Sequence, residues 1–505
     1  MLDVRVNCPS CGAPLAFRPG TMVAVCGYCK ALSARTDRDP RLIGKVADLV
    51  ATGSRLALGM EGSFAGRSFR LAGRTQLRHP LGGVWDEWYL AFPDGRWGWL
   101  AEAQGKFYLT FRQDLSAPPP PVDALQPGME LNLGTAGNWA VAEVSQATLA
   151  SAEGEIPWSV EDLGERYAYA DLHGRNGAFA TLDYSDAAPV LFSGRETTLV
   201  DLKLTAIPPM PGGERLKAQS LPCPHCASPL KLQAPDSAER VVCPSCSSLL
   251  DASQGRLTYL KSLKQPEARM FIPLGGEGTL RGRKVVCAGF MVRTCTIEGE
   301  TYPWREYLLL EPDKHAFLWL VESDGHWSLA EAVNQGDLNR ERGGRLVQYR
   351  GETLKRFQHY DASVAGVWGE FYWKVEQGER ATVIEYAKAP WLLAEERQRH
   401  GDQGAEVNWS LSTYLEPQEV WTAFGLKGFP PSKEGIAPHQ PNPHLASASS
   451  LLRWMWAALA VWILVLSVQC ATHRNRLLYT QEFNLTEAAA LAQAAKSQGK
   501  AMAEG

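Results

Sequence analysis

The chain has 505 residues, 45% apolar and 21% charged, which excludes both a single small domain and a largely disordered protein. Its formal net charge of -4 excludes the overall positive field that attracts a nucleic-acid backbone, so nucleic acid is not the expected partner. The 17 tryptophans and 46 glycines favour strands and turns.

Residues 1–40 contain the first two Cys-x-x-Cys pairs. Cys8 and Cys11 are followed, after fourteen intervening residues, by Cys26 and Cys29. Two such pairs supply the four thiolates of a tetrahedral centre and leave no open coordination position for catalysis. The spacing therefore predicts a zinc ribbon with a structural Zn²⁺ ion. An iron centre with the same ligands and a pair of redox-active dithiols are the alternatives.

A similar cysteine pattern returns in residues 214–256, at an offset of about 215 residues. Cys223 and Cys226 are followed, after sixteen intervening residues, by Cys243 and Cys246, which predicts a second zinc ribbon. Further matches between the copies are residues 58–62 with 274–278, 99–102 with 319–322, 154–161 with 369–376, and Trp85 and Glu87 with Trp304 and Glu306. A match over this length predicts a tandem duplication, which determines the architecture before any single motif is interpreted.

Each ribbon is followed by a β-rich module, over residues 41–206 in the first copy and 257–426 in the second. Short apolar and aromatic runs end at Pro-Asp turns, at residues 93–94 and 312–313, which is typical of strands. Prolines near residues 116–127 divide the first module into two lobes, and residues 207–213 separate the copies. We predict a mainly β fold, in which each module is a barrel or a sandwich.

The repeated Gly-Glu-x-x-Trp block contains the candidate ligand-binding residues, Glu155 with Trp158 and Glu370 with Trp373. A carboxylate three residues from an indole can hold a cation by charge and by the face of the ring, as in a site for a polyamine or a basic peptide. The alternative is that each Trp fills the core and each Glu accepts backbone amides at a turn.

No familiar catalytic motif occurs in the sequence. HExxH, a Walker-type phosphate loop, GxGxxG after a strand and GxSxG are all missing, so we predict no catalytic residue and expect no enzyme of a familiar class. Cys287, Cys295 and Cys470 lie outside the Cys-x-x-Cys pairs and are interpreted as packing residues.

One membrane crossing is predicted near the end of the chain. A proline-rich linker over residues 427–450 precedes a transmembrane helix over 451–472 and a short tail over 473–505. Residues 454–471 carry no charge, and eighteen helical residues span about 27 Å. A buried core helix is the alternative. Because residues 1–6 do not resemble a signal peptide, we expect the bulk of the chain to remain cytoplasmic.

Several of these motifs resemble the bacterial DUF4178 family. They are Cys-Pro-x-Cys at residues 8–11, the Gly-x-Glu-Gly turn at 59–62, Trp-x-Glu at 85–87, the Gly-Glu-x-x-Trp blocks and Glu-Val-Asn-Trp-Ser at 406–410. The resemblance extends over most of residues 8–425 and implies a bacterial protein, for which the predicted crossing and the cytoplasmic bulk of the chain indicate the inner membrane. It also implies a setting beside polyamine aminopropyltransferases and S-adenosylmethionine decarboxylase-like proteins, without implying a reaction.

These observations lead to one functional hypothesis and two alternatives. We expect a non-enzymatic, membrane-tethered adaptor or binding protein, with a cytoplasmic protein partner or a polyamine or basic ligand, linked to polyamine metabolism or envelope stress. The first alternative is an enzyme or accessory subunit acting on polyamines. The second is a nucleic-acid binder that uses its zinc ribbons.

Overall fold

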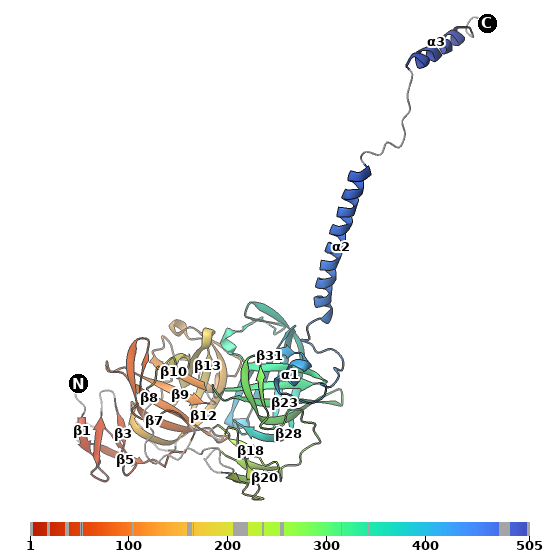
Figure 1. Cartoon of the computed structure of the whole chain (residues 1–505). Helices are drawn as coiled ribbons and strands as arrows, with labels where there is room; N and C mark the ends of the chain where they lie inside the picture. The colour runs from red at the N-terminus through yellow and green to blue at the C-terminus, as the bar shows by residue number, and fades with distance from the viewer. Residues whose placement is uncertain are drawn as a thin grey trace. The chain divides into compact units, whose positions relative to one another are not determined.

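A computed structural model describes most of the chain, which divides into two compact units, residues 1–441 and 442–505. The described residues are 4–17, 21–35, 40–50, 52, 54–103, 106–158, 164, 166–205, 221–234, 237–252, 257–314, 316–341, 343–473 and 485–501. The first unit consists of strands joined by short turns, with one short helix (Figure 1). The mainly β fold predicted for the tandem modules is confirmed.

The first module has ten described strands, of which eight form a closed antiparallel ring. Its strands are β6 (Glu61–Phe64), β7 (Arg67–Arg78), β8 (Val84–Ala91), β9 (Trp97–Ala103), β10 (Lys106–Gln113), β11 (Glu130–Asn132), β12 (Asn138–Ile156), β13 (Arg166–His173), β14 (Ala178–Asp183) and β15 (Val190–Thr197). The ring runs β7-β8-β9-β10-β15-β14-β13-β12 and closes by pairing of β12 with β7. We call this ring barrel 1. The two lobes contribute four strands each.

The second module repeats this ring. Its strands are β21 (Glu277–Leu280), β22 (Arg283–Ile297), β23 (Glu300–Glu311), β24 (Ala316–Ser323), β25 (His326–Ala332), β26 (Asn339–Arg340), β27 (Leu346–Tyr349), β28 (Glu352–Phe371), β29 (Arg380–Lys388), β30 (Trp391–Arg399) and β31 (Gly404–Leu415). Barrel 2 runs β22-β23-β24-β25-β31-β30-β29-β28 and closes on β22. Of the two predicted topologies, the strand pairings therefore select the barrel over the sandwich.

Each barrel closes through one long, bent strand. β12 has 19 residues and β28 has 20, and register shifts in their ladders bend both of them. Such bulges turn a strand so that it pairs with one neighbour along its first part and another along its second, as a closed barrel requires. β12 also pairs with β31, at Glu143↔Glu406, and so joins the two barrels in one sheet.

The ribbons extend these same long strands. Ribbon 1 consists of β1 (Val4–Asn7), β2 (Pro14–Phe17), β3 (Val23–Val25), β4 (Ala31–Ala34) and β5 (Arg41–Lys45), and ribbon 2 of β16 (Leu221–Pro222), β17 (Pro229–Leu230), β18 (Arg240–Val242), β19 (Ser248–Asp251) and β20 (Thr258–Ser262). β3 pairs with the end of β12 and β18 with the end of β28. Each metal-binding module is thereby attached to its barrel by backbone hydrogen bonds.

The apolar cores lie between the barrel strands and the segments that cover them. Trp88, Leu90 and Leu109 of barrel 1 are buried with Leu56 and Leu202 from outside the ring. A second cluster packs the other side of the ring under residues 115–141. Short 3-10 turns connect strands at Val122–Ala124, Gly134–Ala136, Arg175–Gly177, Gln335–Asp337 and Gly401–Gln403. The opposite faces of the ring strands are thereby left to line the barrel interior.

The chain after barrel 2 packs against that barrel before it reaches the second unit. α1 (Pro417–Ala423) buries Val420 and Trp421 in the core of barrel 2. The Glu434 amide donates to the Asp324 carbonyl at 2.8 Å, and His439 is buried with its ring 5.5 Å from that of Tyr414. Residues 427–441, predicted as a linker, thus follow the surface of the module.

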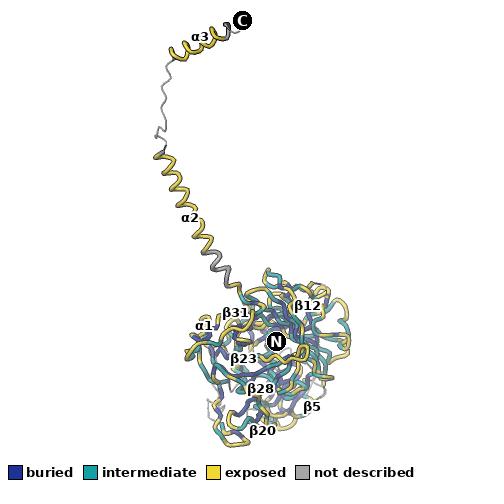
Figure 2. Tube along the Cα trace, turned by 90° about the vertical axis from the view of Figure 1, so that its right-hand side faces the viewer, coloured by how far each residue is buried: buried dark blue, intermediate teal, exposed yellow. Residues whose placement is uncertain are grey.

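The second unit contains α2 (Pro443–His473) and α3 (Leu485–Ala501). Within α2, residues Leu451–Thr472 are long and apolar enough to cross a membrane, and none of their most apolar stretch is buried. Figure 2 shows α2 exposed along its described length. By length and composition, Leu451–Thr472 is therefore a candidate membrane span.

Two glycines are required where β7 crosses β12. A Cβ on Gly73 would lie 1.6 Å from the Glu155 carbonyl oxygen, and Gly154 combines a φ of +72° with a Cβ position 2.4 Å from the Ala72 carbonyl oxygen. In barrel 2, a Cβ on Gly289 would lie 2.5 Å from the Glu370 carbonyl oxygen. A Cβ on Gly369 would lie 2.4 Å from the Ala288 carbonyl oxygen. The glycines shared by the copies therefore mark the point at which each barrel closes.

We expect Gly154→Ala to lower the free energy of unfolding by about 3 kcal/mol, since left-handed backbone and overpacking each cost about 1–3 kcal/mol. The control is Gly66→Ala, with a φ of +75° and nothing within 4 Å of the added Cβ. It is expected to cost only about 1 kcal/mol. Denaturant unfolding of the solubilised full chain measures both values. Equal losses would show that the close approach is not what requires glycine.

Candidate functional site

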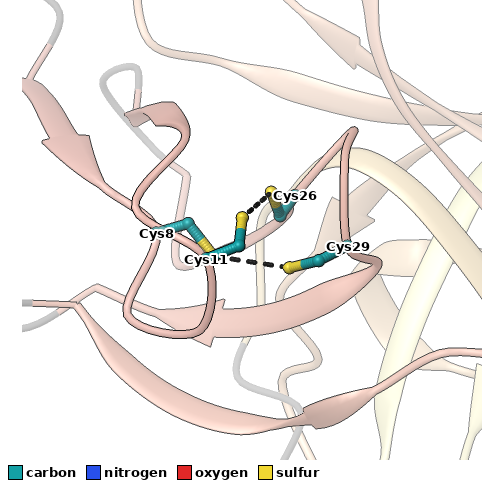
Figure 3. Close-up of side chains that lie close together, drawn as sticks. All are labelled: Cys8, Cys11, Cys26 and Cys29. Atoms are coloured by element: carbon teal, nitrogen blue, oxygen red, sulfur yellow. Dashed lines mark hydrogen bonds between the residues drawn. The ribbon is translucent and has the colours of Figure 1, made fainter.

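The first four-cysteine cluster has the geometry of a tetrahedral metal site. The Sγ atoms of Cys8 and Cys29 lie 3.7 Å apart, as do those of Cys11 and Cys26, and Figure 3 shows the four side chains converging. A tetrahedral zinc–thiolate centre has bonds of about 2.3 Å, which places its sulfurs about 3.8 Å apart. The separation is much longer than the roughly 2.0 Å of a disulfide.

The second cluster repeats this geometry. The Sγ atoms are 3.8 Å apart for Cys223 and Cys246 and 3.7 Å apart for Cys226 and Cys243. In both clusters the four ligand atoms all lie within 4.8 Å of one another. The residue after each Cys-x-x-Cys has a positive φ, at Gly12, Lys30, Ala227 and Ser247. Each knuckle thus turns tightly enough to direct both thiols to one point, so the eight residues could hold two metal ions.

The predicted ligand residues Glu155 and Glu370 lie where the ribbons join the barrels. Glu155 is buried and accepts a hydrogen bond from the Thr21 hydroxyl of ribbon 1 at 2.5 Å. Glu370 is buried and accepts from the backbone amides of Gln233 and Ala234 in ribbon 2, at 2.5 Å and 2.7 Å. Each buried glutamate thus joins its barrel strand to the neighbouring ribbon by hydrogen bonds. We call these two contacts the ribbon clasps.

Trp158 and Trp373 lie apart from those clasps, on the wall of the central cavity. Trp158 makes an edge-to-face contact with Trp99 at 4.8 Å, and Trp373 makes one with Trp319 at 5.5 Å. The structure therefore does not place each carboxylate and its neighbouring indole on one surface. A ligand-binding role for these four residues stays a prediction.

A large cavity runs through the interiors of the barrels. Its volume is about 3020 Å³, several times that of a small-molecule pocket, which is commonly about 300–1,000 Å³. Inward-facing side chains of β8, β9, β13 and β14 line it in barrel 1, and their counterparts line it in barrel 2. Trp85 and Tyr169 contact each other across barrel 1 with ring centroids 6.1 Å apart. The cavity thus includes the inward faces of both rings and extends to residues outside the rings, such as Glu239 and His439.

Glu87, Asp171 and Asp183 are among the carboxyl groups that line the cavity in barrel 1. Loss of hydration raises the pKa of Glu87 to about 7, and it raises that of Asp171 to about 8 with a further contribution from the charge of Glu143. Burial also raises the pKa of Asp183. Among the described residues no Lys or Arg forms an ion pair with these three carboxyls. Barrel 1 therefore brings together carboxyl groups that resist ionisation and that no described Lys or Arg pairs with.

Barrel 2 has a cation at the corresponding place. The Arg293 guanidinium donates to both carboxylate oxygens of Glu396, at 2.9 Å and 3.0 Å, and lies 3.6 Å from Glu306. It also lies over the Trp304 ring, 5.7 Å from the centroid. Although burial opposes it, Arg293 lowers the pKa of Glu396. Arg293 thus gives two interior carboxyls of barrel 2 a cationic partner from within the chain.

Sequence reasoning found part of this interior without recognising its role. The Trp85 indole donates to Glu87 at 3.2 Å and the Trp304 indole to Glu306 at 2.6 Å, so the repeated Trp-x-Glu motif contributes a ring and a carboxylate to each cavity. No repeated motif in the sequence pointed to the other interior residues, Asp171, Asp183, Arg293 and Glu396. Residues two apart on a strand share a face, and this spacing was the available clue.

The DUF4178 family model, described as a domain of unknown function, matches residues 57–198 and 273–417, which is more than half of the chain. The chain belongs to the DUF4178 family. Each DUF4178 match contains one barrel, and the eight ribbon cysteines lie outside both matches. The matched region is narrower than the range of residues 8–425 expected from the resemblance.

Other comparisons add little to the family. A search of curated proteins finds no match. A crystal structure of a protein with unknown function from the DUF3598 family of Nostoc punctiforme aligns at 10% identity over 73% of this chain and 99% of that one. Its TM-score is 0.12, which is too low to relate the two folds.

We expect the purified DUF4178 protein to contain two metal ions per chain, one for each cysteine cluster. Cys243→Ser should leave one ion and lower the thermal stability of ribbon 2, because a small metal-binding module depends on its ion to fold. Elemental analysis measures the content. Cys470→Ser, in the apolar helix, is the control and should retain both ions. Two ions in Cys243→Ser would place the second metal elsewhere.

The raised pKa of Asp171 has a consequence for stability. Unfolded aspartate titrates near pH 4, whereas the folded carboxyl has a pKa of about 8, so the stability that it contributes is lost as pH rises from about 4 to about 8. Asp171→Asn should therefore flatten the fall in unfolding free energy between about pH 5 and pH 8, measured by denaturant unfolding.

The control for that experiment is Asp94→Asn. Although slight desolvation opposes it, hydrogen bonds from Arg96 lower the pKa of this exposed carboxyl, so it titrates below the measured range. Its pH dependence should match that of the wild type. A wild-type slope in Asp171→Asn as well would show that Asp171 is ionised throughout.

Proposed function

We propose that this DUF4178 protein is a non-enzymatic, membrane-tethered binding protein whose barrel interior takes an organic cation. One observation carries the proposal: Glu87, Asp171 and Asp183 share the interior of barrel 1 with aromatic rings, and no described Lys or Arg is paired with them. Each of these carboxyls accepts a hydrogen bond from the chain, but ionising a buried carboxyl without a cationic partner costs free energy that a bound cation recovers. Aromatic faces add an attraction for the same kind of ligand.

Polyamines are the ligand class that we propose for this interior. They are flexible chains with several ammonium groups, and the barrel 1 residues that we assign to the ligand line part of a cavity of about 3020 Å³ that extends over both barrels. The implied setting beside polyamine enzymes points the same way. A protein partner that presents lysine or arginine side chains would bind to the same carboxyl and aromatic groups. The adaptor role is therefore tested as well.

Zinc is the metal that we propose for both ribbons. Four thiolates at the observed spacing suit Zn²⁺, and when bound the ion would supply folding energy rather than catalysis, because all four positions are taken by cysteine. The ribbon clasps at Glu155 and Glu370 would then transmit that stability to the ends of β12 and β28. The ribbons would hold the barrels in shape.

The membrane helix gives the proposed protein its location. Leu451–Thr472 has the length and mean hydropathy, 2.0, of a single crossing. We propose the bacterial inner membrane from the resemblance to a bacterial family and from the candidate span. We place both modules on the cytoplasmic side because two clusters of free cysteines suit a reducing compartment. A tethered binding protein at that surface would collect its ligand close to the membrane.

Titration of the detergent-solubilised full chain with spermidine, followed by calorimetry and tryptophan fluorescence, tests the proposal. We expect saturable binding with an apparent affinity for spermidine that rises about tenfold from pH 6 to pH 8. The reason is that the Glu87 carboxyl, with a pKa of about 7, ionises over that range. A neutral polyether of similar length is the control and should not bind. No heat and no fluorescence change with spermidine or putrescine would contradict the proposal.

Affinity purification from solubilised membranes tests whether the protein has a protein partner. Recovery of one defined partner that competes with spermidine would assign the interior to a basic protein segment. Turnover of spermidine by the purified protein would instead support the enzyme alternative.

A further inference from the structure

Each interior position of barrel 1 has a counterpart in barrel 2, because the two rings have the same strand pairings. Leu77 pairs with Trp85 on the neighbouring strand, and Arg293 pairs with Trp304. Two residues further along, Glu87 and Glu306 occupy matching positions. The remaining counterparts are Tyr169↔Asp183 in barrel 1 and Val383↔Glu396 in barrel 2.

The Arg293 site is a complete recognition site for a cationic group. Glu396 accepts both of its charged hydrogen bonds, Glu306 adds a second carboxylate at 3.6 Å, and Trp304 provides a ring face. Paired N–H donors from a guanidinium match a carboxylate closely and are stronger than neutral hydrogen bonds. Arg293 is itself almost enclosed, with its side chain 11% exposed. Barrel 2 therefore shows what this arrangement holds.

Barrel 1 retains the recognition residues and lacks the arginine. Trp85, Glu87 and Asp183 correspond to Trp304, Glu306 and Glu396, whereas Leu77 stands in place of Arg293. The Trp85 indole still orients Glu87 through a hydrogen bond of 3.2 Å. The duplication has thus left the acceptors of barrel 1 without the cation that neutralises them in barrel 2.

A second polar group points into the same place. The Tyr167 side chain is enclosed within barrel 1, and the charges of Glu87, Asp183 and Asp171 act on it. No hydrogen-bond partner of its hydroxyl occurs within the described part of the chain. Two carboxylates, a ring face and this hydroxyl together surround a space that a donor-rich cation would fill.

We infer that barrel 1 contains a subsite for a guanidinium or primary ammonium group, formed by Trp85, Glu87, Asp183 and Tyr167, and that Arg293 occupies the matching subsite of barrel 2. This inference rests on the proposed function and makes it specific. Only barrel 1 binds a ligand at this position, and the ligand presents one such group there. The remainder of the ligand lies in the wider cavity.

Leu77→Arg supplies barrel 1 with the arginine that barrel 2 already has, and it provides the test. Agmatine, with one guanidinium and one primary ammonium group, is the probe, with putrescine as the diammonium comparison. The variant should bind agmatine more than about tenfold more weakly than the wild type, because the introduced guanidinium occupies the subsite. Its thermal midpoint should equal or exceed that of the wild type.

Two controls separate occupation of the subsite from general effects. Leu77→Met changes the side chain without adding charge, and Leu42→Arg adds the same charge on an exposed residue of ribbon 1. Both should bind agmatine as the wild type does. Loss of binding in either one as well would overturn the assignment, since the effect would then be general.

The converse variant tests the role of Arg293. Arg293→Leu should open the second subsite, so that calorimetry finds two agmatine molecules per chain in place of one, and agmatine should raise its thermal midpoint more than that of the wild type. An unchanged stoichiometry without thermal stabilisation would overturn the assignment of Arg293 as an occupant.

The outcomes distinguish this inference from the proposed function. If wild type and Leu77→Arg bind agmatine equally, the cavity binds cations elsewhere and only the inference fails. If the wild type binds no cation, both fail. Should Leu77→Arg not fold, Asp183→Asn decides: an affinity lowered more than about tenfold supports the subsite, and unchanged affinity rejects it.

Discussion

Closure of each barrel through a single long strand is the constraint on which the rest of the structure depends. β12 pairs with β7, β13, β3 and β31, and therefore connects the ring, the ribbon and the second barrel. The strand can serve all of these partners only because it bends, and because glycines permit the backbones to approach at the crossing. β28 repeats the arrangement. Failure at this crossing would separate the ribbon from the barrel and open the cavity.

A closed ring also determines the electrostatics of the interior. Strands far apart in sequence bring their inward faces together, so that carboxyls from β8, β13 and β14 share one poorly hydrated space. In water such groups would ionise independently, but here each raises the cost of ionising the next. Barrel 2 resolves this conflict with Arg293, and barrel 1 leaves it unresolved among the described residues. Divergence at one position between two copies can thus separate a structural barrel from a binding one.

The ribbons and the apolar helix act at the two ends of this arrangement. The cysteine clusters stabilise small modules that have little apolar core of their own, and each module clasps its barrel through one buried glutamate. The helix Leu451–Thr472 belongs to a separate compact unit and exposes its apolar side chains. The two candidate metal sites, the proposed ligand site and the candidate membrane span therefore lie in different parts of the chain.

The sequence by itself determined the features that depend on local spacing. Cysteine knuckles, the duplication, strands bounded by turns and a long apolar helix are each set by residues close together in the chain, and all of them recur in the structure. Only the tertiary structure decided that the strands form barrels, that Glu155 clasps a ribbon, and that Glu87 and Asp183 share one interior. One face of each ring strand packs against outer segments, and the other face lines the cavity. The alternation of residue types along a strand therefore could not show which side chains point into the barrel. Closure of the barrel determines which side chains lie opposite each other in its interior. It pairs strands that are far apart in the sequence, and no local sequence pattern predicts such a pairing.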